Sequence, residues 1–463
     1  MPLIATGACV ILILALFWLD RERRVRTSAA LLIPMAWLLI AGSRNISEWL
    51  NLSGPSDAVD RYMEGNPVDR NILSLLMLAG LVVLYQRRSR VVALLKANLP
   101  VVSFFLYAGL SVVWSDFPLV GGKRWFRGLG DVIMVLVILS EVEWPAALRW
   151  VFTRIAFIFI PTSILFIRYY PDLGRAYGID GSVYWTGVAS GKNSLGMICL
   201  IFGMACVWSL IEFYRTCRGS ERRQRLFAHG LVVAMAVYLF WIADSKTSLA
   251  CFVLVGAVMA LTAISTWARK PAVVRTMMLS VAVCCFSVLF LGIGSGALTA
   301  IGRNSTLTGR TDVWKLVLRF VENPVFGAGY ESFWMGKRLE RIVDINGGIN
   351  QAHNGYIEIY LNLGVIGVSL LGLIIVTGFR KVVRGFQQDP EACRIRMAYF
   401  LVAVVYNFTE GAFKMMSPVW ISFLLGMMAP ARLHLRNRKV TVTPPAAAID
   451  HYETELPLAH PAR

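Results

Sequence analysis

The sequence predicts an all-α membrane protein in which about 12–13 helices cross a bilayer. Three observations point to this class. The chain is 57% hydrophobic and only 16% charged, whereas soluble domains are roughly 45–50% apolar and about 25% charged. Apolar runs recur along nearly the whole length, each close to the ~20 residues that cross a bilayer core. The mean hydropathy of +0.60 agrees, and the short alternating segments of a transmembrane β-barrel do not occur.

Taken in order, the apolar runs predict the individual spans. The first run carries its charges on its C-terminal side and has no small-residue cleavage site, so we expect a retained helix rather than a signal peptide. The predicted spans lie near residues 3–19, 28–42, 71–85, 99–114, 128–140, 150–167, 194–214, 227–243, 247–267, 276–299, 356–378, 396–411 and 415–431.

These spans divide the chain into four parts. A transmembrane bundle covers residues 1–299, a large extracytoplasmic loop 300–355, and further spans 356–431. A cytoplasmic tail, residues 432–463, is rich in proline and alanine with mixed charge. Such a composition is typical of disorder.

Basic residues determine the expected orientation. Arg-rich segments follow the predicted spans 1, 3, 7, 9, 11 and 13, all of them odd-numbered, and the positive-inside rule places such segments in the cytoplasm. The N-terminus is then outside and the C-terminus inside. The net charge of +18 reflects topology and attraction to anionic membrane lipid, not nucleic-acid binding. The Arg-rich segments are "RERRVR", "QRRSR", "RTCRGSERRQR", "ARKPAVVR", "FRKVVRGF" and "RLHLRNRK".

With this orientation, His353 is the only histidine on the extracytoplasmic face. His229 falls at the inner end of a span, and the other three histidines lie in the tail. Of the eight cysteines, those outside the spans lie in basic loops. We therefore expect neither a disulfide framework nor a cysteine metal site.

Several cations remain on the expected outer face, where short loops are normally poor in Lys and Arg. A charge at membrane depth costs about 2.5–3.5 kcal/mol on insertion scales, so such residues are often paired or functional. Extension of the side chain to the interface accounts for about half of them. Lys246 and Arg310 stand out because small polar residues flank both. The set comprises Lys123, Arg124, Arg127, Arg168, Arg175, Lys192, Lys246 and Arg310.

"TGRTDVWKLVLRFVENP" predicts a short amphipathic helix in the outer loop. Thr308 or Thr311 is the expected N-cap, and Pro324 lies beyond the end. Because one face is apolar, we expect the helix to lie flat on the membrane. Its N-terminus offers free N–H groups beside Arg310, which suits a phosphate. The apolar face consists of Val313, Val317, Phe320 and Val321.

Five segments together resemble the O-antigen ligase and polysaccharide polymerase superfamily. His353 and Asn354 are followed by nine residues and then by Gly364-Val-Ile-Gly367, which matches that family's signature. The other four look like family segments and occur in the usual order. They are "SGKNSLG" at 190–196, "DSKTSLA" at 244–250, "GRTDVW" at 309–314 and "NPVFGAGYESF" at 323–333.

The resemblance implies a GT-C-like enzyme of the bacterial inner membrane, with its active site facing the periplasm. It implies metal-independent, inverting glycosyl transfer without a cofactor. The donor would be a glycan on undecaprenyl diphosphate, and the acceptor lipid A–core or a growing glycan. The family's essential histidine corresponds to His353 and one essential arginine to Arg310. A second family arginine stands where this chain has Lys246, which keeps the charge but loses the bidentate geometry.

Elementary chemistry agrees with these roles. A diphosphate leaving group needs positioning and neutralisation of charge, which cations supply, and no outer cluster of Asp, Glu and His has metal-ligand spacing. Neutral imidazole, whose ordinary pKa is ~6.5, suits deprotonation of an acceptor hydroxyl. We expect His353 to act as the base, while Arg310 and Lys246 hold the pyrophosphate. Lower-ranked phosphate contacts, in order, are Lys192 with Asn193, then Arg124 with Arg127, and last Arg175.

Three further residues each have two interpretations. Asn354 and Tyr356 shape the acceptor side, or they are a helix cap and an interfacial aromatic, and the second role is favoured for Tyr356. Glu410 orients the imidazole, or it is a solvated helix end. "WSDFP" at 114–118 is assigned a structural role, although it resembles exopolysaccharide polymerases more than typical ligases.

Two alternatives stay open at this point. A ligase and a polymerase share the donor chemistry and differ in the acceptor, which no residue reports. A lipid-linked glycan flippase or transporter would show internal repeats and polar groups near the membrane midplane. The polar residues of this chain gather at the expected outer face instead.

Overall fold

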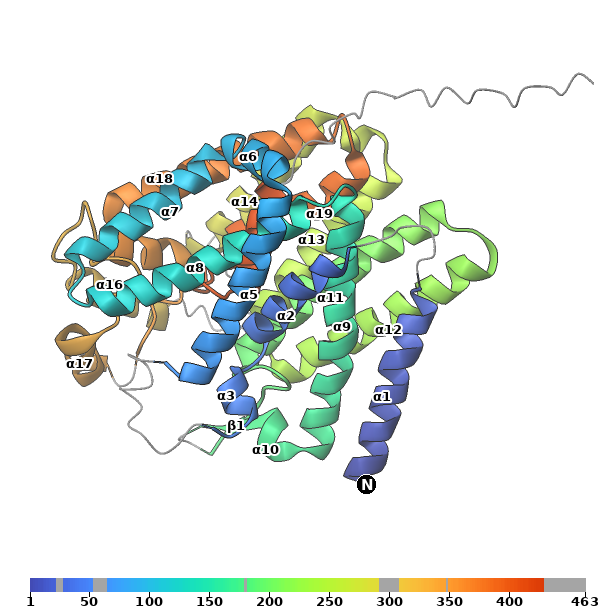
Figure 1. The fold of residues 1–463 in the computed structure, drawn as a ribbon, viewed down its shortest axis with the longest axis horizontal. Coiled ribbons are helices and arrows are strands. Elements are labelled where there is room, and N and C mark those ends of the chain that lie inside the picture. Colours follow the sequence, from blue (N-terminus) through green and yellow to red (C-terminus); the bar gives the residue numbers. More distant parts are fainter. Residues whose placement is uncertain (22–27, 53–64, 179–180, 291–307, 347–348, 429–463) are drawn as a thin grey trace, which may run out of the picture. The chain divides into compact units, whose positions relative to one another are not determined.

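The computed structural model describes residues 1–21, 28–52, 65–178, 181–290, 308–346 and 349–428. Helices dominate, and the described residues contain two short strands, which pair antiparallel with Arg175 opposite Trp185. The elements (Figure 1) are α1 (Pro2–Leu19), η1 (Ala29–Leu31), α2 (Leu32–Gly42), α3 (Ile46–Trp49), α5 (Pro67–Gln86), α6 (Arg88–Lys96), α7 (Leu99–Leu110), η2 (Ser111–Trp114), α8 (Pro118–Leu139), α9 (Trp144–Tyr169), α10 (Pro171–Gly174), β1 (Arg175–Tyr177), β2 (Val183–Trp185), α11 (Lys192–Thr216), α12 (Gly219–Ala243), α13 (Lys246–Ile264), η3 (Trp267–Arg269), α14 (Pro271–Phe290), α16 (Thr308–Leu318), α17 (Gly336–Asn346), α18 (Gly355–Gly385), α19 (Pro390–Tyr406) and α20 (Pro418–Met428).

The predicted fold class is confirmed, and each predicted span overlaps a helix of the described residues. Within the described residues, eight helices are long and apolar enough to cross a membrane, or nine if the bent pair α6–α7 is one span. The predicted span 128–140 begins earlier than expected, because α8 starts at Pro118 and encloses the "GGKRWFRGLGD" cations. The predicted span 276–299 is described as far as Phe290, and the predicted tail 432–463 lies outside the described residues.

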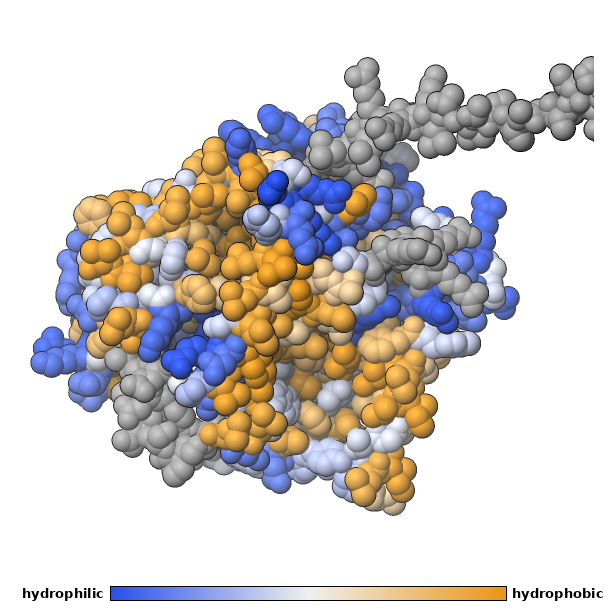
Figure 2. All heavy atoms as spheres, in the orientation of Figure 1, coloured by the Kyte–Doolittle hydropathy of each residue, from blue (hydrophilic) through white to orange (hydrophobic). Residues whose placement is uncertain are grey.

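The central helix of the bundle is α19, which is buried along its length from Ala392 to Tyr406. It packs against α11, α13, α14, α18 and α20. Peripheral helices instead expose large apolar side chains such as Ile11, Leu78 and Trp241. Figure 2 shows apolar side chains over much of one face, with hydrophilic ones gathered mainly along its upper and right-hand edges. An apolar perimeter around a packed interior is what a lipid environment requires.

Basic residues of three described segments come together at one end of the helices. Arg215, Arg269 and Arg394 lie near enough for their charges to act on one another, although they come from three different segments. In Figure 1, α3, α10 and β1 lie at the opposite end, with the start of α1. The grouping follows the alternation of the sequence, and which end faces the cytoplasm stays a prediction.

The amphipathic segment forms α16, but its predicted position on the membrane surface is wrong. Val313 and Val317 are buried in a small core with Phe333, Ile342 and Leu361. This apolar face therefore covers the rest of the outer loop rather than lipid. A second helix of that loop, α17, was not predicted, since its segment is mostly polar and charged.

The "WSDFP" segment has the structural role expected of it. The Trp114 ring packs against the rings of Tyr107 and Phe326. The Asp116 carboxylate pairs with the guanidinium of Arg338 at 3.0 Å. The segment thus fastens the end of η2 to the outer loop.

Candidate functional site

His353 lies at the entrance to α18, immediately before the residue that caps the helix. Asn354 Oδ1 accepts hydrogen bonds from the backbone N–H groups of Tyr356 (3.0 Å) and Ile357 (3.1 Å). Such a cap satisfies donors that the first helical turn leaves free, so the helix-cap interpretation of Asn354 is confirmed. His353 itself has a left-handed backbone with φ of +50°. This conformation costs a non-glycine residue roughly 1–3 kcal/mol, and it persists only where surrounding contacts impose it.

Glu410 joins the two residues that the sequence singled out most strongly. Its Oε1 lies 3.0 Å from Arg310 Nη2, and its Oε2 lies 3.6 Å from His353 Nδ1. The side chains of Arg310, His353 and Glu410 are 29%, 33% and 12% exposed, respectively. Nδ1 of His353 is buried, and no hydrogen bond reaches it from the described residues. The accessible edge of the imidazole is therefore the one away from the carboxylate.

The loop that carries Glu410 is fixed by the start of α18. The Gly355 N–H donates to the carbonyl groups of Asn407 (2.9 Å) and Glu410 (3.1 Å). Asn407 Oδ1 accepts from the N–H groups of Ala412 (2.8 Å) and Phe413 (2.9 Å). A Cβ on Gly355 would stand 1.9 Å from Asn407 Oδ1, so only glycine allows this approach. The end of α19 and the start of α18 are thereby held together.

Arg310 reaches the cluster from the first turn of α16. One turn later, the indole N–H of Trp314 donates to the carbonyl of Ala352 at 2.8 Å. This bond ties α16 directly to the residue before His353. The helix begins at Thr308, so Arg310 lies inside the helix rather than ahead of its first residue. The partial positive charge of the helix N-terminus adds to the charge of the Arg310 guanidinium, so an anion is favoured at this position.

The "DSKTSLA" and "SGKNSLG" segments lie together beside this cluster. A Cβ on Gly196, in the first turns of α11, would stand 2.3 Å from Ser245 Oγ. The Ser248 hydroxyl, in the first turn of α13, lies close enough to act on the Tyr406 hydroxyl, as do the charges of Glu410 and Arg310. Lys246 is exposed at the start of α13. The structure therefore links its segment to the Arg310–Glu410 pair through Tyr406.

The lower-ranked residues make other contacts. Arg175 donates to the carbonyl of Ile167 and stacks on the Trp185 ring. Arg124 donates to the carbonyl of Glu331. The remaining three occupy different surroundings: Arg127 faces the carboxylates of Asp69 and Asp131, Lys192 lies 4.9 Å from the centre of the Tyr184 ring, and Asn193 is half-buried at the start of α11.

Tyr356 is part of the packing around the loop. Its hydroxyl donates to the carbonyl of Val404 at 2.9 Å, and its ring packs against Phe408 and Phe413. These contacts agree with the structural interpretation that the sequence favoured.

The glycine of the signature marks a break in α18. Gly364 has φ of +63° and ψ of −163°, and a Cβ there would stand 2.2 Å from the Val325 carbonyl oxygen. At this break the carbonyls of Leu361 and Asn362 accept hydrogen bonds from the N–H groups of Ala328 (3.0 Å) and Gly329 (2.8 Å). The "NPVFGAGYESF" segment is therefore attached to the helix that begins at His353. The nine-residue spacing sets the distance between the histidine and this attachment.

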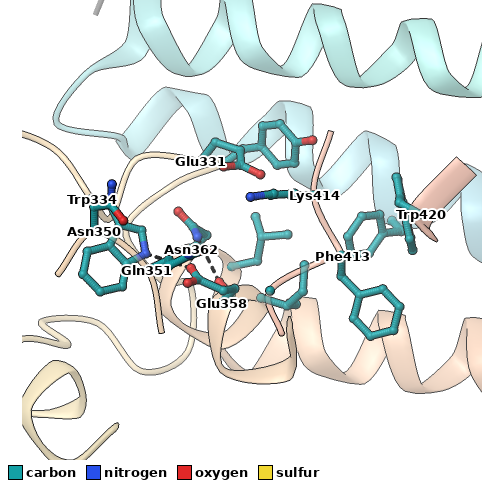
Figure 3. A pocket seen from close by; sticks show the side chains of 14 residues that line it. Glu331, Trp334, Asn350, Gln351, Glu358, Asn362, Phe413, Lys414 and Trp420 are labelled. Carbon is teal, nitrogen blue, oxygen red and sulfur yellow. Dashed lines mark hydrogen bonds between the residues drawn. The ribbon is translucent and has the colours of Figure 1, made fainter. Parts of the chain in front are cut away.

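A pocket of 280 Å³ lies between this attached segment and the loop that follows Glu410 (Figure 3). Gln351 and Gly411, near neighbours of His353 and Glu410 in the sequence, belong to its wall. Its polar residues were not predicted. They are Glu331, Asn350, Gln351, Glu358, Asn362 and Lys414.

One signal in the sequence could have found part of this pocket. Glu358 is an acidic residue at the start of an apolar run, where a charge is costly and often functional. Its two oxygens accept hydrogen bonds from the Ala352 N–H and from the Trp334 indole at 2.5 and 2.8 Å. No pattern marks Glu331, which the chain holds in a left-handed conformation with φ of +52°.

Burial raises the pKa of the Glu331 carboxyl, and the nearby charges of Lys414 and Arg124 act against this shift. Burial also raises the pKa of the adjacent Tyr330 well above its ordinary value. Of the pocket residues, Tyr330 is buried and Glu331 is half-buried, whereas Asn350 and Lys414 are exposed. In the described part of the chain, no group of three or more His, Cys, Asp and Glu side chains is placed to hold a metal ion.

Comparison with known proteins agrees with four of the five motifs, those that lie within the matched region. Residues 230–372 match the family model described as O-antigen ligase. The chain is also 26% identical over 309 residues to the exopolysaccharide production protein ExoQ of Rhizobium meliloti (strain 1021), an alignment that covers 63% of this chain and 67% of that protein. The family match includes Lys246, Arg310 and His353. The region that carries these motifs is thus similar to the O-antigen ligase family, and the chain as a whole resembles a protein of exopolysaccharide production.

Proposed function

We propose that the protein transfers a glycan from undecaprenyl diphosphate to an acceptor hydroxyl at the periplasmic face of the inner membrane. The observation that carries this proposal is the shared carboxylate of Glu410, which contacts His353 on one side and Arg310 on the other. A base for the acceptor and a cation for the diphosphate thus stand at opposite sides of one group. Such an arrangement fits a reaction in which the acceptor binds at the exposed edge of the imidazole and the diphosphate binds at the neighbouring guanidinium.

In this mechanism His353 accepts the proton of the acceptor hydroxyl at the exposed edge of its ring. The hydroxyl oxygen attacks the anomeric carbon, and the bond from that carbon to the diphosphate oxygen breaks with inversion. The proton remains on His353 until solvent removes it. The Glu410 carboxylate stabilises the imidazolium because opposite charges at 3.6 Å attract in a partly shielded site. A positioned base typically contributes about 10²–10⁴-fold in rate.

The leaving undecaprenyl diphosphate carries the charge that builds up in the transition state. Arg310 and Lys246 neutralise this charge, since groups aimed at developing charge stabilise the transition state more than the ground state. Arg310 offers a bidentate guanidinium, whereas Lys246 offers one compact charge. The helix N-terminus of α16 adds a partial positive charge beside Arg310.

The relative's printed role in exopolysaccharide production favours a growing glycan over lipid A–core as the acceptor. We therefore propose polymerisation of exopolysaccharide repeat units, with ligation as the second candidate. Both functions use the same donor chemistry. A flippase would need no base beside a cation at the outer boundary.

The test uses full-length protein purified in detergent, with lipid-linked repeat units extracted from native membranes. Wild type is expected to elongate the glycan without a membrane gradient, and His353→Ala to reduce elongation by at least about 100-fold. His434→Ala, in the predicted cytoplasmic tail, is the matched control and should retain full activity. Transfer by His353→Ala at the wild-type rate, with normal protein yield, would falsify the base role.

The cellular phenotype separates the two acceptors. Loss of a polymerase leaves single repeat units on the lipid carrier. Loss of a ligase leaves full-length chains on that carrier. Glycan export that continues in the His353→Ala strain with normal chain length would support the flippase instead.

A further inference from the structure

The 280 Å³ pocket beside His353 has no part in the mechanism above, yet its lining has a definite chemical character. Trp334, Phe413 and Trp420 supply aromatic surfaces, and the polar lining residues carry carboxylates, amides and one ammonium group. Figure 3 shows the Lys414 ammonium and the Glu331 carboxylate pointing into the space above Asn362. Aromatic faces with convergent hydrogen-bonding groups suit a ligand that has apolar faces and polar edges, as a sugar ring does.

The polar groups of the pocket are held in place by the protein. Asn362 Oδ1 accepts from the N–H groups of Ser332 and Phe333 at 2.9 and 3.0 Å. Glu358 is anchored by the two donors described above. Glu331 is half-buried, and among the described residues its carboxylate makes no hydrogen bond or ion pair. Because this carboxylate lines the pocket, it is available to accept a hydrogen bond from a ligand hydroxyl.

The charges of the lining residues determine which part of the substrates this pocket can bind. Two carboxylates, Glu331 and Glu358, face one ammonium, Lys414. A diphosphate or an acidic sugar would meet repulsion here, whereas Arg310 and Lys246 lie in the other cluster. The pocket is therefore matched to uncharged hydroxyl groups rather than to the anionic carrier.

We propose that this pocket binds an uncharged sugar residue of the acceptor glycan and so positions the hydroxyl that His353 deprotonates. The inference rests on the proposed glycosyl transfer. Position in the chain supports it, because Gln351 belongs to the pocket wall two residues before His353, and Gly411 follows Glu410. The pocket volume is close to the lower limit of about 300 Å³ for small-molecule sites, which agrees with one or two sugar rings.

The experiment measures binding and kinetics separately. The binding probe is the repeat-unit oligosaccharide released from its lipid carrier by mild acid, titrated calorimetrically into the full-length protein in detergent. We expect Glu331→Gln and Lys414→Met each to weaken its binding about tenfold or more. In the transfer assay the same variants should raise the acceptor KM by a similar factor, with kcat and the donor KM within about twofold of wild type.

Matched controls come from the exposed face of α17, where Glu340→Gln and Lys337→Met make the same chemical changes outside the pocket. Both should bind the oligosaccharide as wild type does. Lys414 is exposed, so Lys414→Met tests the pocket even if Glu331→Gln fails to fold. Inorganic pyrophosphate should compete with the donor and leave oligosaccharide binding unchanged.

Three results would overturn the inference: unchanged oligosaccharide affinity in both pocket variants, a rise of the donor KM instead of the acceptor KM, or displacement of the oligosaccharide by pyrophosphate. The proposed function has a separate readout. His353→Ala should lose transfer while it still binds the oligosaccharide. Transfer by that variant would refute the base role, whereas the binding titrations would still report on the pocket.

Discussion

Replacement of Glu410 by glutamine tests the link between the base and the cation directly. The substitution keeps the size and hydrogen-bonding shape of the side chain and removes its charge. In the wild type this charge lies 3.6 Å from His353 Nδ1 and 3.0 Å from Arg310 Nη2. The variant therefore loses stabilisation of the imidazolium that forms as the acceptor hydroxyl gives up its proton.

The magnitude follows from the distance and the exposure. Two unit charges about 4 Å apart attract by about 4 kcal/mol at an effective dielectric constant of about 20. The side chains of His353 and Glu410 are 33% and 12% exposed, so solvent screens part of this energy. We expect roughly 1.5–3 kcal/mol, the range for hydrogen bonds to charged groups. Because about 1.36 kcal/mol corresponds to a tenfold change in rate, kcat should fall about 10- to 150-fold.

The assay is turnover of the lipid-linked donor by purified protein at saturating acceptor. The donor KM of Glu410→Gln should stay the same or fall, since Arg310 loses a competing partner for the diphosphate. Glu340→Gln, on the exposed face of α17, controls for the loss of one carboxylate. Within a His353→Ala background, Glu410→Gln should have no further effect on kcat, because residues that act as a unit are not additive.

Two outcomes would refute this reasoning. A kcat of Glu410→Gln within about twofold of wild type would show that the charge does not assist the histidine. A full additional loss in the His353→Ala background would show that Glu410 acts on another group.

Three further predictions concern the backbone, the diphosphate site and the pocket. Gly364→Ala should lower the free energy of unfolding in detergent by at least about 1–3 kcal/mol, because φ is +63° and a Cβ would meet the Val325 carbonyl at 2.2 Å. Gly372→Ala is the control, since the space around its Cβ position is open, and it should leave the free energy of unfolding unchanged. Equal stabilities of the two variants would show that the break in α18 does not require glycine. Lys246→Ala should raise the donor KM about tenfold. Lys246→Arg should leave the donor KM near the wild-type value, since a guanidinium also contacts phosphate. A large rise of the donor KM in Lys246→Arg would argue for a role of Lys246 other than its charge. Burial raises the pKa of Glu331, so folding favours its protonated form and the free energy of unfolding of the wild type should fall as pH rises through that pKa. Thermal unfolding of Glu331→Gln should lack this fall. The same dependence of thermal stability on pH in both proteins would show that Glu331 does not cause it.

Much of the fold could be predicted from local pattern alone. Apolar runs of membrane length predicted every described span, since a backbone in lipid must satisfy its own hydrogen bonds by forming helices. The pattern failed for α16, whose apolar face is equally suited to lipid and to protein. Only the packing of Val313 and Val317 against Phe333 and Leu361 decided between them.

Some residues of the candidate site could likewise be predicted from the sequence, and others were found only in the structure. Spacing and residue type singled out His353, Arg310 and Lys246, because a base and cations for a diphosphate leave a chemical signature in the sequence. The pocket residues Glu331 and Lys414 left none. Their role depends on segments far apart in the chain meeting, and no local rule reports such a meeting.

The sequence by itself determined that this chain crosses a membrane many times, because hydropathy acts locally, and it singled out one imidazole and two cations for the chemistry that we propose. Only the tertiary structure decided that Glu410 stands between His353 and Arg310, and that a broken α18 holds the "NPVFGAGYESF" segment against a polar pocket. These arrangements arise from long-range hydrogen bonds and from glycine positions without room for a side chain, as at Gly355 and Gly364. The energy of such contacts depends on both partners at once, so it cannot be read from either segment alone.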